Sequence, residues 1–287
     1  MAADENEWLT LIEDSLLKSD IGDNSYNAAR DWSPSSPLTQ SYKLCLSDEH
    51  PFKDLKIGNT EDLSYITGRN VCCECGKSRK YYCYSCCIPL EMTKGIIPTL
   101  DALPLKVDIV KHKREIDGKS TATHAKVICP SHVRIFIYPE LPPNLLDNKE
   151  ENIVLVYPGK NSLPLRDYLR KDTKSSIRID RVIFIDSTWN QAKGIYADPK
   201  LRSLPTIILE ERETIFWRYQ TGKAKECLST IEAIYYFILD YSRFALDKSS
   251  YNGEYDNLLF LFKFMFEKIH KIYGKDNLRR YKGTSLQ

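Results

Sequence analysis

Two closely spaced cysteine pairs constrain the fold of this chain more than any other feature of its sequence. Both pairs have the spacing Cys-x-x-Cys, and their members are Cys72, Cys75, Cys83 and Cys86. Each pair fits a tight turn that delivers two thiolates to one ion, and two such turns complete a tetrahedral Zn²⁺ site. The neighbouring Cys73 and Cys87 have no cysteine partner at this spacing. We therefore expect the four paired residues to bind a structural zinc ion, with buried or redox-active thiols as the alternative.

The composition excludes several classes of protein. Of the 287 residues, 42% are hydrophobic and 28% are charged, as in soluble globular proteins and unlike disordered or fibrous chains. No stretch approaches the roughly 20 continuous apolar residues of a membrane-spanning helix. The acidic start is unlike a signal or transit peptide, and nine cysteines without a secretion signal argue against a disulfide framework. We expect a cytosolic or nuclear protein.

Charge is distributed unevenly along the chain. Residues 1–24 contain seven acidic residues and one lysine, so the rest of the chain carries a net charge of +8 although the total is only +2. A mildly basic body is compatible with a polyanionic partner, and equally with an ordinary solvated surface.

Short apolar runs alternate with helical patterns from residue 71 onward. The expected strands span 105–110, 127–129, 133–138, 153–157, 182–185 and 206–209. The expected helices span 163–171, 190–204, 229–246 and 257–273. Strands separated by helices predict an α/β layer fold with a largely parallel sheet, and the continuous apolar run at 182–185 is typical of a central strand.

Four regions are expected to follow one another along the chain. They are a poorly ordered acidic leader, an N-terminal segment with the zinc element, the main domain, and a C-terminal helix with a basic tail. Their expected bounds are 1–40, 41–100, 101–256 and 257–287.

A Pro-Gly turn follows the expected strand at 153–157. Pro158 and Gly159 form a tight turn whose backbone can approach a ligand closely. Ligands of α/β folds bind at the carboxyl ends of parallel strands, which is where this turn is expected. Taken alone the motif is a weak signal, because most Pro-Gly pairs are only turns.

The apolar strand at 182–185 leads into Asp186-Ser187-Thr188-Trp189. Ser187 or Thr188 can cap the following helix, whose start offers free amides to a carboxylate or phosphate. Asp186 is either a further cap or a general base.

Two further segments stand out, and several common motifs are missing. Ser229 and Glu232 form a capping box at the start of the helix at 229–246, which explains both residues without any function. A basic loop spans 112–121.

The chain contains neither a P-loop motif nor G-x-G-x-x-G, so P-loop and ordinary Rossmann dinucleotide binding lack support.

Together these motifs resemble the DTW family of proteins. The D-x-T-W signature of that family stands at 186–189, with the cysteine pairs, the loop 112–121 and the Tyr157-Pro-Gly turn upstream, and Leu228-Ser-Thr-x-Glu-Ala233 downstream. The similarity runs from about residue 68 to residue 256. It implies a SPOUT-like α/β fold with a trefoil knot at the cofactor site. It also implies a tRNA-uridine aminocarboxypropyltransferase, which moves the 3-amino-3-carboxypropyl group of S-adenosylmethionine to N3 of a D-loop uridine, forming acp3U and methylthioadenosine.

The resemblance implies roles for individual residues. Because uridine N3 is a poor nucleophile while it keeps its proton, Asp186 is expected to be the base, with Thr188 and Trp189 completing the catalytic motif. Trp189 either stacks on adenine or uracil or packs beneath its helix. The residues expected to bind S-adenosylmethionine are Tyr157, Pro158, Gly159, Ser162, Ser187, Leu209, Ser229, Thr230 and Glu232.

Basic residues are expected to contact the phosphates of tRNA. They are Lys111, His112, Lys113, Arg114, Lys119, Arg212 and Arg218. Two other functions stay open: a SPOUT-type RNA methyltransferase that uses the same donor, and a non-catalytic zinc-ribbon adaptor that binds RNA. We expect neither a membrane nor an obligate protein partner, and the resemblance favours the nucleus.

Overall fold

The computed structural model describes residues 51–145, 151–170, 177–217, 226–246 and 251–273. The chain divides into two compact units. The larger unit comprises Leu55–Glu211 and Ser229–Met265, and it holds both the cysteine pairs and the sheet. The other unit comprises Met1–Asp54, Arg212–Leu228 and Phe266–Gln287. The acidic leader expected at 1–40 and the basic tail beyond residue 273 lie outside the described residues.

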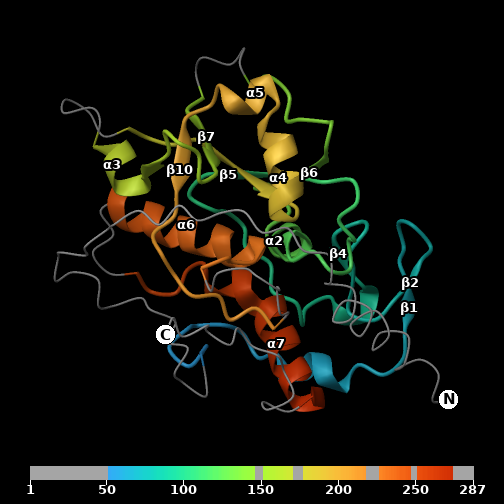
Figure 1. Ribbon diagram of the computed structural model, residues 1–287. Coiled ribbons are helices and arrows are strands. Elements are labelled where there is room, and N and C mark those ends of the chain that lie inside the picture. The colour runs from blue at the N-terminus through green and yellow to red at the C-terminus, as the bar shows by residue number, and fades with distance from the viewer. Residues whose placement is uncertain (1–50, 146–150, 171–176, 218–225, 247–250, 274–287) are drawn as a thin grey trace, which may run out of the picture. The chain divides into compact units, whose positions relative to one another are not determined.

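A six-stranded sheet forms the centre of the larger unit (Figure 1). Its strands are β5 (Lys106–Lys111), β6 (Val133–Ile137), β7 (Ile153–Val156), β8 (Leu163–Pro164), β9 (Arg181–Asp186) and β10 (Thr206–Ile208). They lie in the order β6-β5-β9-β7-β10-β8, and every recorded pairing between them is parallel. The prediction of an α/β fold with a mostly parallel sheet is confirmed, and the apolar run at 182–185 lies in a central strand.

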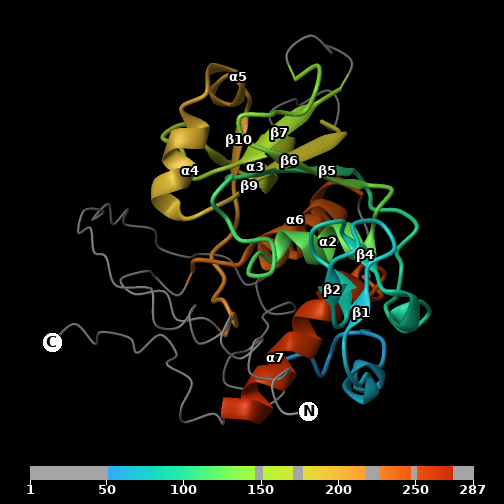
Figure 2. The same ribbon diagram turned by 90° about the vertical axis from the view of Figure 1, so that its right-hand side faces the viewer.

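Helices cover both faces of this sheet. They are α2 (Ala122–Ile128), α3 (Leu165–Leu169), α4 (Trp189–Tyr196), α5 (Pro199–Arg202) and α6 (Thr230–Ala245). On the α4 face, Ile183 of β9 packs in one cluster with Ile195 and Leu201. On the other face, Phe184 contacts Phe237 of α6 edge-on, with ring centroids 5.9 Å apart. Figure 2 shows α4 and α5 on the side of the strands opposite α2 and α6. Because successive strand residues point to opposite faces, a strand covered on both sides is continuously apolar.

Two predicted elements differ from the structure. The strand expected at 127–129 is wrong: Val127 and Ile128 end helix α2, where Ala122 and Ala125 are also buried. Burial against neighbouring elements overrides the β-propensity of such a short apolar run. The helix expected at 190–204 is divided, because Pro199 cannot continue the hydrogen bonding of α4 and begins α5 instead.

Two other helices begin later than expected. The segment 163–171 starts as strand β8 before α3, and residue 171 lies outside the described residues. The helix expected at 257–273 begins with the 3-10 turn η3 (Asp256–Leu259) and continues as α7 (Phe260–Tyr273). None of the helices in the described ranges is both long and apolar enough to cross a membrane.

A network of ion pairs joins neighbouring strands near their amino ends, which we call the amino edge of the sheet. The fully buried Asp108 of β5 accepts two hydrogen bonds of 2.8 Å from the guanidinium of Arg134, in a bidentate pair. Arg181 of β9 lies 3.2 Å from the same carboxylate and also pairs with Glu151. Two cations therefore neutralise one buried carboxylate at this edge.

The cysteine pairs lie in two short antiparallel hairpins that precede the sheet. We call this region, residues 70–89, the cysteine element. Its strands are β1 (Asn70–Val71), β2 (Ser78–Arg79), β3 (Tyr82–Cys83) and β4 (Ile88–Pro89). The 3-10 turns η1 (Glu61–Tyr65) and η2 (Glu91–Thr93) flank it.

Candidate functional site

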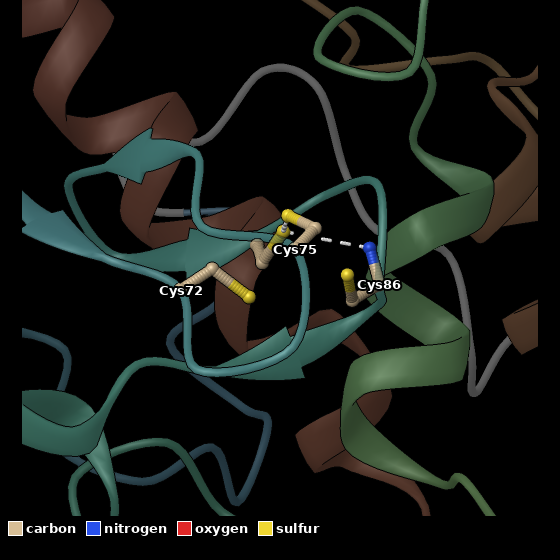
Figure 3. Close-up of side chains that lie close together, drawn as sticks. Cys72, Cys75 and Cys86 are labelled. Atoms are coloured by element: carbon tan, nitrogen blue, oxygen red, sulfur yellow. Dashed lines mark hydrogen bonds between the residues drawn. The ribbon is translucent and has the colours of Figure 1, made fainter.

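The four paired cysteines converge on one point. Their sulfur atoms all lie within 4.8 Å of one another, and those of Cys75 and Cys83 are 3.6 Å apart. Four sulfurs at about 2.3 Å from a central Zn²⁺ would stand about 3.8 Å apart, so the cluster fits a metal of this kind. Figure 3 shows the side chains of Cys72, Cys75 and Cys86 turned toward one another. The grouping predicted from spacing is confirmed, and the two unpaired neighbours are not part of it.

Backbone hydrogen bonds shape the first cysteine turn. Gly76 N donates to Cys72 O at 2.9 Å, and Gly76 has a φ of +69°, a conformation that glycine adopts without strain. A backbone hydrogen bond from Cys75 lowers the pKa of Cys72 to about 7, whereas burial raises the pKa of Cys86. A bound cation would favour the thiolate at both positions.

The carboxyl ends of the parallel strands bring the predicted loops to one edge of the sheet. The register pairs Lys111 of β5 with Asp186 of β9, and Val156 of β7 with Phe184 of β9. The Pro-Gly turn after β7, the D-x-T-W turn after β9 and Leu209 after β10 therefore all leave the sheet at the same edge. We call these carboxyl ends the catalytic edge, because open parallel sheets bind their ligands there and the catalytic residues are expected there.

Asp186 is held on both carboxylate oxygens at this edge. The hydroxyl of Ser120 donates to Oδ2 at 2.7 Å, and the hydroxyl of Thr230 donates to Oδ1 at 2.6 Å. Asp186 is only 4% exposed. Ser120 is also buried, whereas Thr230 is half-buried, so Thr230 is the partner on the solvent side. Each carboxylate oxygen has two acceptor sites, so a proton can still be received.

The surroundings of Asp186 make it a better proton acceptor than an ordinary aspartate. Burial raises its pKa, although the hydrogen bonds from Thr230 and Ser120 and the charge of Lys111 oppose this shift. The charge of Asp117 acts in the same direction as burial. A carboxyl group with a raised pKa binds a transferred proton more firmly.

The loop after β5 carries partners of Asp186 that sequence analysis missed. We call residues 112–120 the edge loop. Lys111, expected among the phosphate contacts, is buried and forms an ion pair with Asp117 of this loop. The loop ends with Ser120, the hydroxyl partner of Asp186. Only the side-by-side register of β5 and β9 brings these residues together, and no local pattern signals it.

The rest of the D-x-T-W turn starts helix α4. Thr188 is its N-cap and forms a capping box with Gln191, whose Oε1 accepts from Thr188 N at 3.2 Å. The alternative in which Asp186 caps this helix is therefore wrong. Trp189 is 38% exposed, so part of its surface is accessible for stacking. The half-buried Ser187 donates to the carbonyl of Thr188 at 3.2 Å.

Ser162 holds the turn after β7 closed. Its Oγ accepts from Gly159 N at 2.8 Å and donates to Tyr157 O at 2.6 Å. The ring of Tyr157 stacks on Tyr196 of α4, with centroids 3.9 Å apart. A Cβ atom at Gly159 would lie 3.0 Å from the hydroxyl of Tyr196, so this close approach favours glycine.

The two predicted loops share the catalytic edge but face different sides of it. Tyr157 packs against the cluster that contains Ile183, on the α4 face. Asp186 lies three residues after Ile183 in the same strand, so its side chain points to the opposite face of the sheet. There it contacts Thr230 at the start of α6. Their convergence on one substrate stays a prediction.

The capping box at the start of α6 is confirmed. Glu232 Oε2 accepts from both Ser229 N at 2.8 Å and Ser229 Oγ at 2.6 Å. The adjacent Thr230 is thereby placed against Asp186. Leu209, the other residue expected at the donor site, is half-buried directly after β10.

The basic residues expected to contact RNA differ in their exposure. Lys113 and Arg114 are exposed on the edge loop, and His112 and Lys119 are half-buried there. Arg212 is half-buried and belongs to the other compact unit. Arg218 lies outside the described residues.

Comparison with known proteins assigns the chain to a family. The model of the DTW domain matches residues 80–270. Relatives named tRNA-uridine aminocarboxypropyltransferase 1 include one from Mus musculus, 38% identical over 82% of this chain and 88% of its own length. The relative from Homo sapiens is 38% identical over 80% and 87%, and that from Xenopus laevis is 42% identical over 73% and 83%. No solved structure matches the chain significantly. On this evidence, and with the D-x-T-W turn placed at the catalytic edge, the chain belongs to the DTW-domain family.

Proposed function

We propose that this chain is a tRNA-uridine aminocarboxypropyltransferase. It transfers the 3-amino-3-carboxypropyl group of S-adenosylmethionine to N3 of a uridine in the tRNA D-loop. The observation that carries the proposal is the Asp186 carboxyl, buried at the catalytic edge between two neutral hydroxyl donors. The relatives that bear this activity in their names support it.

The reaction needs a proton acceptor more than it needs an activated donor. The sulfonium of S-adenosylmethionine is already a good leaving group, whereas uridine N3 carries a proton that blocks its lone pair. Removal of that proton lets N3 form a bond to the methylene carbon next to sulfur. The carbon–sulfur bond breaks, its electron pair stays on sulfur, and neutral methylthioadenosine leaves with acp3U as the other product.

Asp186 receives the N3 proton through Thr230. The half-buried hydroxyl of Thr230 accepts the proton from N3 while it passes its own proton to Asp186 Oδ1, 2.6 Å away. The raised pKa of Asp186 favours this transfer. Lys111 balances the local charge without neutralising the base directly, since its own ion-pair partner is Asp117.

The donor lies along the turns that leave the catalytic edge. Trp189, exposed at the start of α4, stacks on adenine or uracil, and the start of α4 holds the donor carboxylate. The remaining donor-binding residues are Tyr157, Pro158, Gly159, Ser162, Ser187, Leu209, Ser229, Thr230 and Glu232. In Ser162 and Glu232 the side chains act by shaping these turns, because their oxygens are engaged in the hydrogen bonds described above.

The fold proposed for this site is SPOUT-like, with a trefoil knot at the donor-binding turns. The parallel sheet and the loops gathered at one edge are compatible with it. The catalytic domain spans 101–256, between the cysteine segment at 41–100 and the C-terminal helix and tail at 257–287. We also propose that the protein acts in the nucleus, and that exposed bases such as Lys113 and Arg114 hold tRNA phosphates.

The cysteine element holds a structural Zn²⁺ ion in this proposal. Replacement of Cys72 by Ser is expected to lower the metal content and the thermal stability together, because binding free energy of such a site is folding free energy. Metal analysis and thermal denaturation of the purified variant measure both. One equivalent of zinc that survives the loss of both Cys83 and Cys86 would contradict the assignment.

Product analysis tests the proposed function. The full chain is incubated with S-adenosylmethionine and a uridine-bearing tRNA, and the small molecule and the digested nucleosides are identified by mass spectrometry. We expect methylthioadenosine and acp3U in equal amounts. S-adenosylhomocysteine with a methylated base would instead identify a SPOUT-type methyltransferase, and the absence of donor binding would identify an RNA-binding adaptor.

A further inference from the structure

A tyrosine of the cysteine element packs directly on the edge loop. Tyr84 stands between Cys83 and Cys86 in the second cysteine turn. A Cβ atom built on Gly118 of the edge loop would lie 3.3, 3.4 and 3.6 Å from three atoms of the Tyr84 ring. Three nearly equal distances place the hydroxyl end of the ring beside Gly118, so a methyl group there would press on the ring at or slightly inside van der Waals contact.

The Tyr84 ring is itself fixed by the cysteine element. The guanidinium carbon of Arg79, in β2, lies 3.9 Å from the centre of the ring, which is a close cation–π contact. The same guanidinium donates to Ser85 Oγ at 3.2 Å. A second aromatic contact joins the cysteine element to helix α2. Tyr82 of β3 packs edge-on against His124, with ring centroids 5.7 Å apart.

Gly118 lies between the two residues by which the edge loop reaches the catalytic edge. Asp117, on one side, pairs with the buried Lys111. Ser120, two residues further on, donates to Asp186. The loop is closed on itself by hydrogen bonds from the amides of Lys119 and Ser120 to Ile116 O, at 2.8 and 3.1 Å. A shift of Gly118 would therefore move both polar partners together.

We propose that the cysteine element positions the catalytic edge, with Tyr84 as the positioning residue that acts through Gly118 on Asp117 and Ser120. The inference rests on the proposed function for its consequence in catalysis, but the contact itself can be tested without any activity. The cysteine element thus does more than stabilise the fold, because it holds the Tyr84 ring that contacts the edge loop. A displacement of about 1 Å at a catalytic group can cost about 100-fold in rate.

The test replaces Tyr84 by Leu, which removes the ring, and by Phe, which keeps it. Tyr65→Leu is the matched control, because Tyr65 is 76% exposed in η1. Hydrogen–deuterium exchange followed by mass spectrometry reports on the peptide that covers 112–120. We expect faster exchange of this peptide in Tyr84→Leu only, and a 10- to 100-fold lower rate of methylthioadenosine release at saturating S-adenosylmethionine. Zinc content should stay at one equivalent in all three variants.

Unchanged exchange of the edge-loop peptide in Tyr84→Leu would overturn the inference, even if the wild-type chain forms acp3U. Faster exchange in Tyr84→Leu, together with a wild-type chain that forms no acp3U, would support the contact between Tyr84 and the edge loop but refute the proposed function. If Tyr84→Leu loses zinc, Gly118→Ala decides, because it leaves the cysteine element intact and places a methyl group 3.3 Å from the ring. Unaltered edge-loop exchange and transfer rate in that variant would likewise overturn the inference.

Discussion

The two edges of the sheet each bury an aspartate, and they hold it in opposite ways. At the amino edge, Asp108 is paired with Arg134 and Arg181, so its charge is neutralised by cations on neighbouring strands. At the catalytic edge, Asp186 is held by the neutral hydroxyls of Ser120 and Thr230. A carboxylate between two arginines joins neighbouring strands through ion pairs, whereas one between neutral hydroxyls can accept a proton. This difference is the reason for proposing Asp186, and not Asp108, as the proton acceptor.

The largest effect on catalysis is expected at Asp186. Replacement by Asn keeps the size and most of the hydrogen bonding but removes the proton acceptor, so turnover should fall by about 100- to 10,000-fold. Binding of S-adenosylmethionine and thermal stability should change little. Single-turnover release of methylthioadenosine, calorimetric binding and a melting curve measure the three quantities. A variant that turns over like the wild type would leave Asp186 a structural residue.

The same substitution at the amino edge is expected to act on stability instead. Asp108→Asn removes the charge that the buried Arg181 and the partly exposed Arg134 share. This should cost about 1–3 kcal/mol of unfolding free energy, because Arg181 keeps its pair with Glu151 and Arg134 keeps contact with solvent. The transfer rate per folded molecule should remain near that of the wild type. Denaturant titration measures the first quantity, and rates corrected for the folded fraction measure the second. A stable Asp108→Asn protein with slow transfer would break the contrast between the two edges.

A smaller effect on the transfer rate is expected from substitutions at Thr230, and these substitutions test the path that the proton takes to Asp186. Thr230→Val keeps the shape but removes the hydroxyl, and Thr230→Ser keeps the hydroxyl. Loss of a hydrogen bond to a charged group is worth about 10- to 100-fold, so the Val variant should be slower by that factor and the Ser variant close to the wild type. Because the hydrogen bond from Thr230 lowers the pKa of Asp186, the rising limb of the pH–rate profile should move to higher pH in Thr230→Val. Equal rates in both variants would exclude the relay.

The smallest effect is expected at the exposed bases of the edge loop. If the exposed Arg114 contacts a phosphate and no base, as proposed, Arg114→Ala should lower tRNA affinity by a similar factor for every uridine-bearing tRNA. The slope of log affinity against log salt should decrease by about 1. Filter binding across a salt series measures it. A preference among tRNAs that changes in the variant would show that Arg114 reads sequence instead.

The contrast between local and distant residues explains what could be predicted from the sequence. The cysteine cluster depends on residues three positions apart in each pair, so its members could be named from spacing alone. The capping box of Ser229 and Glu232 is equally local. Ser120 and Asp117 could not be named, because they reach the catalytic edge only through the register of β5 with β9. The strand expected at 127–129 failed for a related reason, since burial around α2 decided its structure.

The pH–rate profile of Asp186→Asn beside the wild type tests the central claim most directly. The claim is that Asp186 takes up the N3 proton, and single-turnover rates at saturating S-adenosylmethionine isolate that step. In the wild type, the rate should rise as Asp186 loses its proton, above the ordinary pH range of an aspartate, and then level off. In Asp186→Asn, the residual rate should be far lower and should keep rising with pH as uridine ionises unaided. A wild-type-like rate and plateau in the Asn variant would contradict the account.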